Sequence, residues 1–174
     1  MASVARFVLA AGVMAGGLAL FGPLDAQGQT KPPADPPSTI FGVNFLIKSQ
    51  QDTNFCIQVT NGTTEGRTIS LQTCGGAETQ RWALTHNSDE SNVILDNQGM
   101  CLDGRSRKGG DGLALPVQKC RFGDAWRFAV LGTGQIRDIK NGKCLQVPGA
   151  ASNGVVSLAD CDVAKPNQKW TFTH

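Results

Sequence analysis

Apolar and polar residues alternate in short runs from about residue 41 to the end of the chain. In "TISLQT", Ile69 and Leu71 fall on one face of an extended strand and the polar residues between them fall on the other, as expected for a half-buried strand. The runs "LALPVQ" and "VVSLAD" repeat this alternation, and Asn-Gly and Asp-Gly pairs separate the runs. No stretch has the period of a helix, so the pattern predicts an all-β fold.

The same unit occurs three times. The three tryptophans, Trp82, Trp126 and Trp170, are each separated from the next by 44 residues, and two cysteines precede each of them. We predict four strands per unit, which in copy three lie near residues 135–140, 143–147, 155–160 and 170–173. A β-propeller has a similar period but needs about four blades or more to close. Three copies of four strands favour a closed threefold fold in which the tryptophans meet in one shared core.

The six cysteines form one pair in each copy. An even number of cysteines in an exported chain indicates disulfide bonds. The first and second cysteines of the three copies are 18, 19 and 17 residues apart, so each pair belongs to one unit. The repeat therefore predicts one disulfide within each copy: Cys56–Cys74, Cys101–Cys120 and Cys144–Cys161.

The N-terminal segment differs from the repeats. Arg6 precedes an uncharged run over residues 7–24 and then small residues, a pattern typical of a secretory signal peptide. We expect a signal peptide over 1–26, a Pro-rich linker over 27–40 and a folded domain over 41–174, with repeats at about 41–90, 91–133 and 134–174. The chain is then secreted or periplasmic. The alternative is an uncleaved signal segment, the one way in which the sequence predicts membrane contact.

Charge and composition argue against several classes of function. The formal net charge is +2 over 174 residues, too small to indicate nucleic acid or an anionic membrane as a partner. The chain has two histidines, and every cysteine has a predicted disulfide partner. We find no zinc-ligand spacing, no phosphate-binding glycine loop and no serine in a nucleophile turn. The sequence therefore predicts no enzyme activity, no catalytic residue, no metal site and no cofactor.

The order of these motifs resembles one known family. Each copy has a first cysteine, an alternating strand, a second cysteine and then a tryptophan motif. The motif is Gln-x-Trp in copy one ("QRW") and copy three ("QKW"), and copy two has the variant "DAW". This order is similar to that of the ricin B-chain lectin family over essentially the whole folded domain. The resemblance implies a β-trefoil of three four-stranded repeats that binds sugars, often of the galactose type, in shallow pockets.

The resemblance also implies candidate carbohydrate-binding residues. In the family, an acid stands two residues after the first cysteine, an aromatic two residues before the second cysteine, and an Asn before the motif glutamine. Copy two alone keeps the acid, and no copy has that aromatic, so we expect degenerate pockets. Copy three has both the Asn and the motif glutamine, so it is ranked first, copy two next and copy one last. The candidates are Gln58, Gln72 and Gln80 in copy one, Asp103, Gln118 and Asp124 in copy two, and Gln146, Asn167 and Gln168 in copy three.

Three functions are consistent with these observations. The first is a secreted carbohydrate-binding module with glycans as partners. The second is a non-catalytic subunit that binds a partner protein or a host cell within a secreted complex such as a toxin, because the aromatic positions are lost. The third, a hydrolase inhibitor, ranks last because inhibitor trefoils lack the Gln-x-Trp repeat.

Overall fold

The computed structural model describes residues 42–62, 64–86, 92–104, 112–121 and 126–174. All of them belong to one compact unit, Asp35–His174. The expected signal peptide (1–26), the expected linker (27–40) and Asp124 lie outside the described residues.

Each repeat supplies four strands. Repeat one forms β1 (Gly42–Ser49), β2 (Phe55–Val59), β3 (Ile69–Thr73) and β4 (Trp82–His86). Repeat two forms β5 (Asn92–Asp96), β6 (Met100–Leu102), β7 (Val117–Lys119) and β8 (Phe128–Val130). Repeat three forms β9 (Ile136–Asp138), β10 (Cys144–Gln146), β11 (Ser157–Ala159) and β12 (Trp170–Thr173). The predicted four-stranded repeats are confirmed, and the four ranges expected in copy three each contain one observed strand.

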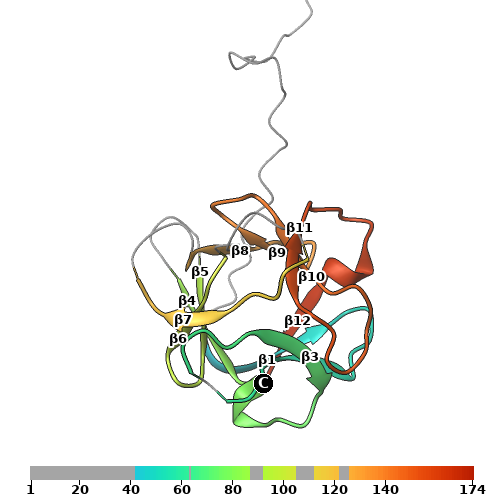
Figure 1. Ribbon diagram of the computed structural model, residues 1–174. Helices are drawn as coiled ribbons and strands as arrows, with labels where there is room; N and C mark the ends of the chain where they lie inside the picture. Colours follow the sequence, from blue (N-terminus) through green and yellow to red (C-terminus); the bar gives the residue numbers. More distant parts are fainter. Residues whose placement is uncertain (1–41, 63, 87–91, 105–111, 122–125) are drawn as a thin grey trace, which may run out of the picture. The chain divides into compact units, whose positions relative to one another are not determined.

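The first and last strands of the repeats form a closed barrel. Antiparallel pairs join β1 to β4, β4 to β5, β5 to β8 and β8 to β9, and β12 pairs with β1. A bridge between Gln135 and Lys169 joins the start of β9 to β12 and completes the ring. Figure 1 shows the last strand, in red, next to the first strand of the chain. The barrel therefore has no open edge that another chain would extend.

The inner strands of the repeats form three hairpins, β2–β3, β6–β7 and β10–β11. Isolated bridges join Thr68 to Pro116 and Ser70 to Val155. The Leu115 backbone N–H donates to the Val156 carbonyl over 3.1 Å. Each hairpin thus contacts the other two, and together with the barrel they form the β-trefoil that the sequence predicted.

The three predicted disulfides are confirmed. Cys56–Cys74, Cys101–Cys120 and Cys144–Cys161 each join Cα atoms 5.0 Å apart. Each bond ties the start of a hairpin to the segment that follows the hairpin. Closing loops of this size stabilises a fold by roughly 3 kcal/mol each when the bond is unstrained.

The tryptophans divide between two clusters. Trp82 and Trp170 lie in the main core, and their indole N–H groups donate to the Ile57 carbonyl (3.0 Å) and the Leu145 carbonyl (3.2 Å). Trp126 is equally buried but packs in a separate cluster with Cys101, Val93 and Leu95. The prediction of one core shared by all three tryptophans is therefore wrong for Trp126. The reason is that Trp126 packs against the half-buried side chains of β5, whose alternate residue Ile94 faces the main core.

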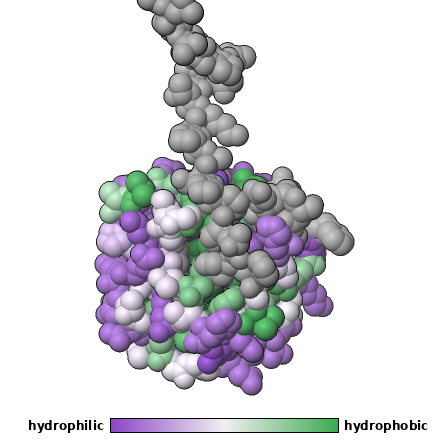
Figure 2. Space-filling model, turned by 180° about the vertical axis from the view of Figure 1, so that it is seen from behind, coloured by the Kyte–Doolittle hydropathy of each residue, from purple (hydrophilic) through white to green (hydrophobic). Residues whose placement is uncertain are grey.

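The surface of the described residues carries few large apolar groups. The face drawn in Figure 2 is mostly hydrophilic, with hydrophobic residues interspersed. Within the part of the chain that the structure describes, the exposed large hydrophobic residues are Val43, Leu113, Ile139, Val155 and Val163. No helix among the described residues has the length and apolar character needed to cross a membrane.

Candidate functional site

The motif glutamines stand at the ends of two short 3-10 helices. The helix η1 (Glu78–Gln80) precedes β4, and η3 (Pro166–Gln168) precedes β12. Pro166 suits the first turn of η3 because that position needs no N–H donor. The strand that follows alternates its side chains, so the tryptophan two residues after each glutamine also points inward. Gln80 and Gln168 are themselves buried, at 2% and 0% exposed.

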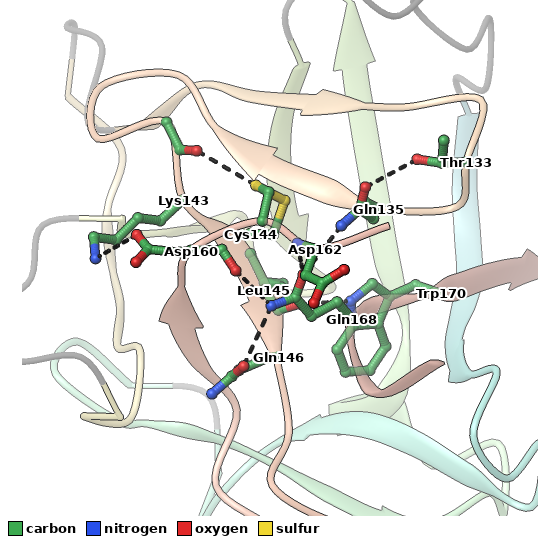
Figure 3. Close-up of a disulfide and its surroundings, with 12 residues drawn as sticks. Thr133, Gln135, Lys143, Cys144, Leu145, Gln146, Asp160, Asp162, Gln168 and Trp170 are labelled. Carbon is green, nitrogen blue, oxygen red and sulfur yellow. Dashed lines mark hydrogen bonds and ion pairs between the residues drawn. A yellow bond between two sulfur atoms is a disulfide. The ribbon is translucent and has the colours of Figure 1, made fainter. Parts of the chain in front are cut away.

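The side chain of Gln168 makes four hydrogen bonds, all to protein groups (Figure 3). Its Oε1 accepts from the Asp162 backbone N–H over 2.8 Å and from Gln135 Nε2 over 3.0 Å. Its Nε2 donates to the Asp160 carbonyl over 2.8 Å and to Gln146 Oε1 over 3.3 Å. Because a primary amide offers two donors and an acceptor with two lone pairs, this side chain is fully satisfied.

The Gln80 side chain also makes four hydrogen bonds in copy one, two at its oxygen and two from its nitrogen. Its Oε1 accepts from the Gly75 and Gly76 backbone N–H groups over 2.9 and 3.0 Å. Its Nε2 donates to the Thr73 carbonyl over 2.8 Å and to Gln58 Oε1 over 3.0 Å. We call Gln58 with Gln80 the copy-one clamp and Gln146 with Gln168 the copy-three clamp.

In both clamps a buried amide holds a half-buried one. Gln58 and Gln146 lie opposite Ser70 and Ser157 in their hairpins. Both glutamines are partly exposed. The motif glutamine therefore sets the orientation of the residue two positions after the first cysteine, where the family has its acid. The direct contact of Gln80 or Gln168 with a sugar, expected from the sequence, stays a prediction, but their burial gives them an internal role.

The remaining candidates of copies one and three have protein partners as well. Gln72 Nε2 donates to Asn153 Oδ1 over 2.6 Å, and its Oε1 accepts from Ser152 Oγ over 2.9 Å, so Gln72 links repeat one to repeat three. Asn167 Nδ2 donates to the Val147 carbonyl over 2.8 Å. Asn167 is half-buried, and its hydrogen-bond partner Val147 is the residue next to Gln146.

Copy two has different residues at these positions. Asp103 follows β6, its backbone N–H donates to the Pro116 carbonyl over 3.0 Å, and the residue is 3% exposed. Gln118 lies opposite Cys101 in the same hairpin and is half-buried. The third candidate of this copy, Asp124, lies outside the described residues.

Sequence reasoning missed one member of the copy-three site. Gln135 is buried, donates to Gln168 Oε1 and accepts from Thr133 Oγ1 over 3.2 Å. The residues Thr133, Gln135, Gln168 and Gln146 therefore form a continuous chain of hydrogen bonds (Figure 3). No motif marks Gln135, because its contact with Gln168 joins segments 33 residues apart.

Two buried carboxyl groups accept hydrogen bonds from the backbone of turns. Asp96 Oδ1 accepts from the backbone N–H groups of Gln98 and Met100, each over 2.9 Å. Asp138 Oδ2 accepts from the Asn141 backbone N–H over 2.8 Å. Burial raises the pKa of both carboxyl groups, and these hydrogen bonds offset part of the rise. Within the described ranges, no cluster of His, Cys, Asp and Glu suits a metal ion.

The trefoil and its repeated clamps define a lectin-type domain. The model of the ricin-type beta-trefoil lectin domain matches residues 44–126 and 95–174, most of the chain. The chain belongs to this family, whose domains are non-catalytic carbohydrate-binding modules.

Two plant proteins are among its relatives. Nigrin b from Sambucus nigra is 26% identical over 153 residues, which cover 87% of this chain and 26% of Nigrin b. Beta-galactoside-specific lectin 2 from Viscum album is 28% identical over 114 residues, which cover 64% of this chain and 19% of that lectin. The chain thus spans about a quarter or less of either relative.

Solved structures share the fold. The designed threefold-symmetric protein ThreeFoil superposes with a TM-score of 0.68 at 20% identity, covering 75% of this chain and 97% of the designed one. A mosquitocidal holotoxin superposes with a TM-score of 0.68 at 14% identity, covering 78% of this chain and 17% of the toxin. These likenesses support the trefoil fold alone.

Proposed function

We propose that the chain is a secreted carbohydrate-binding module that recognises galactose-type or related glycans, with copy three as its principal site. In this proposal Gln146 and Asn167 contact the ligand and Gln168 positions Gln146. The copy-one clamp forms a second site around Gln58, and Asp103 with Gln118 marks a third. The three disulfides and the N-terminal apolar segment support export to an oxidising compartment.

One observation carries the proposal: in copies one and three a buried motif glutamine accepts two hydrogen bonds at Oε1 and donates from Nε2 to a backbone carbonyl and to a partly exposed glutamine. A buried, fully bonded glutamine that holds a partly exposed amide is a preorganised polar group, which binding sites use to fix ligand orientation. The relative named as beta-galactoside-specific supports galactosides as the first ligands to test.

The test is titration of the mature chain with galactosides and screening on a glycan array. We expect weak binding, because no copy has the aromatic that would cover the apolar face of a sugar. The double variant Gln146→Ala and Asn167→Ala should reduce binding, whereas Gln51→Ala, at an exposed glutamine outside the clamps, should not. Failure of the chain to bind any glycan at millimolar concentration would overturn the proposal.

The second candidate is a subunit that binds a partner protein or a host cell. Its motive is that the aromatic positions hold Gln72, Gln118 and Ala159, and that Gln72 bonds to Ser152 and Asn153. Affinity capture from the secreted proteins of the native source tests it. A chain that binds glycans and retains no protein partner at stoichiometric amounts would reject this candidate.

A further inference from the structure

We propose that the sites of copies one and three prefer sugars that carry a carboxylate, such as uronic acids, over neutral sugars. This proposal rests on the proposed function, since it names the ligand class of the same sites. It follows from the direction of the hydrogen bonds within the two clamps, which determines the group that Gln58 and Gln146 present to a ligand.

Backbone groups fix the orientation of the buried amide in copy three. The Asp162 N–H only donates, so the Gln168 atom that it contacts is the oxygen, Oε1. The Asp160 carbonyl only accepts, so the atom that it contacts is the nitrogen, Nε2. The usual ambiguity between the two ends of an amide is therefore removed. The second N–H of Gln168 must find an acceptor, and Gln146 has to supply Oε1 to it.

The outer amide consequently presents its nitrogen. With Oε1 held by Gln168, the Nε2 group of Gln146 is directed away from the clamp (Figure 3). This group has two N–H donors and no acceptor. An aspartate at the same place would present carboxylate oxygens, which only accept. The site thus presents hydrogen-bond donors to a ligand, whereas a site with an aspartate at this position presents acceptors.

Copy one gives the same result independently. The Gly75 and Gly76 N–H groups identify Gln80 Oε1, and the Thr73 carbonyl identifies Gln80 Nε2. Gln58 therefore accepts with Oε1 and presents Nε2. Two sites in one molecule reach the same polarity through different backbone partners.

The charge balance then selects the ligand. A hydrogen bond in which one partner is ionised is roughly twice as strong as a neutral one. In a site with an aspartate the protein provides the charge and the sugar is neutral. Gln58 and Gln146 are neutral donors, so a charge-assisted bond forms only when the ligand is the anion. A carboxylate beside an aspartate would instead be repelled.

The acidic groups near copy three do not oppose an anionic ligand strongly. Asp160 lies 3.2 Å from Lys143 Nζ, and its side chain is 92% exposed. Asp162 lies 3.9 Å from Lys165 Nζ. Each of these carboxylates has a lysine nearby, which offsets its charge, and solvent screens what remains. The formal net charge of the whole chain is +2.

The test compares three ligands that share one ring: galactose, galacturonic acid and the methyl ester of galacturonic acid. They differ at carbon 6, where galacturonic acid alone carries a charge. Calorimetry or ligand-detected NMR with the mature chain measures the three affinities. We expect galacturonic acid to bind about tenfold or more tightly than the other two, and the preference to decrease with added salt.

Variants separate the clamps from general charge effects. The double variant Gln58→Asp and Gln146→Asp should remove the preference for the acid, since carboxylate then meets carboxylate. The matched control, Gln51→Asp and Gln98→Asp, changes the net charge equally at exposed glutamines outside the clamps and should keep the preference.

The outcomes distinguish this proposal from the one on which it rests. Equal affinity for galactose and galacturonic acid, or equal loss of preference in the control, overturns the carboxylate proposal and leaves carbohydrate binding intact. Absence of binding to all three sugars and to the glycan array overturns both.

Discussion

Replacement of the buried amide in copy three, Gln168→Leu, tests the central feature of the site. Leucine fills a similar volume but neither donates nor accepts hydrogen bonds. The variant leaves three protein groups without a partner: the buried Gln135 Nε2, the Asp162 N–H and the Asp160 carbonyl. Gln146 is half-buried, so water replaces its lost bond.

The expected loss in the free energy of unfolding follows from these three unpaired groups. A buried polar group left unsatisfied costs about 1–3 kcal/mol, and partial access to water places the Asp160 and Asp162 groups toward the low end. Burial of the leucine side chain offsets part of the sum. We expect a loss of about 3–5 kcal/mol in the free energy of unfolding, a large share of the roughly 5–15 kcal/mol typical of a domain.

Chemical denaturation with the disulfides intact measures this loss, followed by tryptophan fluorescence. Gln80→Leu is the comparison variant: Gln80 also has four side-chain hydrogen bonds, but among the described residues it lacks a buried amide partner such as Gln135, so the variant should be destabilised by a smaller amount. Gln51→Leu, at an exposed position, should change stability by less than about 0.5 kcal/mol. A loss below about 1 kcal/mol for Gln168→Leu would refute the assignment of the motif glutamine to a satisfied internal network.

The other predictions concern the core and a buried carboxyl group. Trp170→Ala should lower the free energy of unfolding by about 3–5 kcal/mol. Trp126→Ala should lower it by less, because Trp126 packs against half-buried side chains outside the main core. Denaturation curves that rank the two variants in the reverse order would contradict this. Burial raises the pKa of Asp96, so the folded state binds the proton more tightly than the unfolded chain. Stability should therefore fall as the pH rises from about 3.9, the pKa of an aspartate in an unfolded chain, to the raised pKa of Asp96 in the folded state. Asp96→Asn keeps an acceptor for the turn and should reduce that fall, so that the variant is at least as stable as the parent at neutral pH. Thermal unfolding across pH measures the stability of the parent and of the variant. A marked loss of stability in the variant at neutral pH would count against this reasoning.

Local patterns in the sequence were enough to predict the architecture. Strand alternation and the position of each cysteine pair depend on residues within one repeat, and the observed strands and disulfides confirm them. The repeat count favoured a closed threefold fold, and the family resemblance implied the β-trefoil; the closed barrel with three hairpins confirms both. These features need no knowledge of which side chains meet across repeats.

Contacts between distant segments could not be predicted in this way. Equal spacing suggested one role for all three tryptophans, yet Trp126 packs with Val93 and Leu95 on another face of β5. The family resemblance implied a ligand contact for Gln168, which stays a prediction, but the burial of that residue and its internal bonds could not be read from the motif. In sequence, a glutamine with four internal partners is indistinguishable from one that faces solvent. Gln135 gave no signal for the same reason.

The clamps suggest why glutamines occur in pairs in this chain. Copies one and three have glutamine both at the motif position and two residues after the first cysteine, whereas copy two has Asp103 and Asp124 at those places. A buried Gln168 has one N–H left for its outer partner, and Gln146 meets it with an oxygen while keeping a donor outward. The inner residue therefore determines the geometry of the site, and the outer residue determines its polarity. We expect a change at the outer position to alter ligand choice with little effect on the fold, and a change at the inner position to affect both.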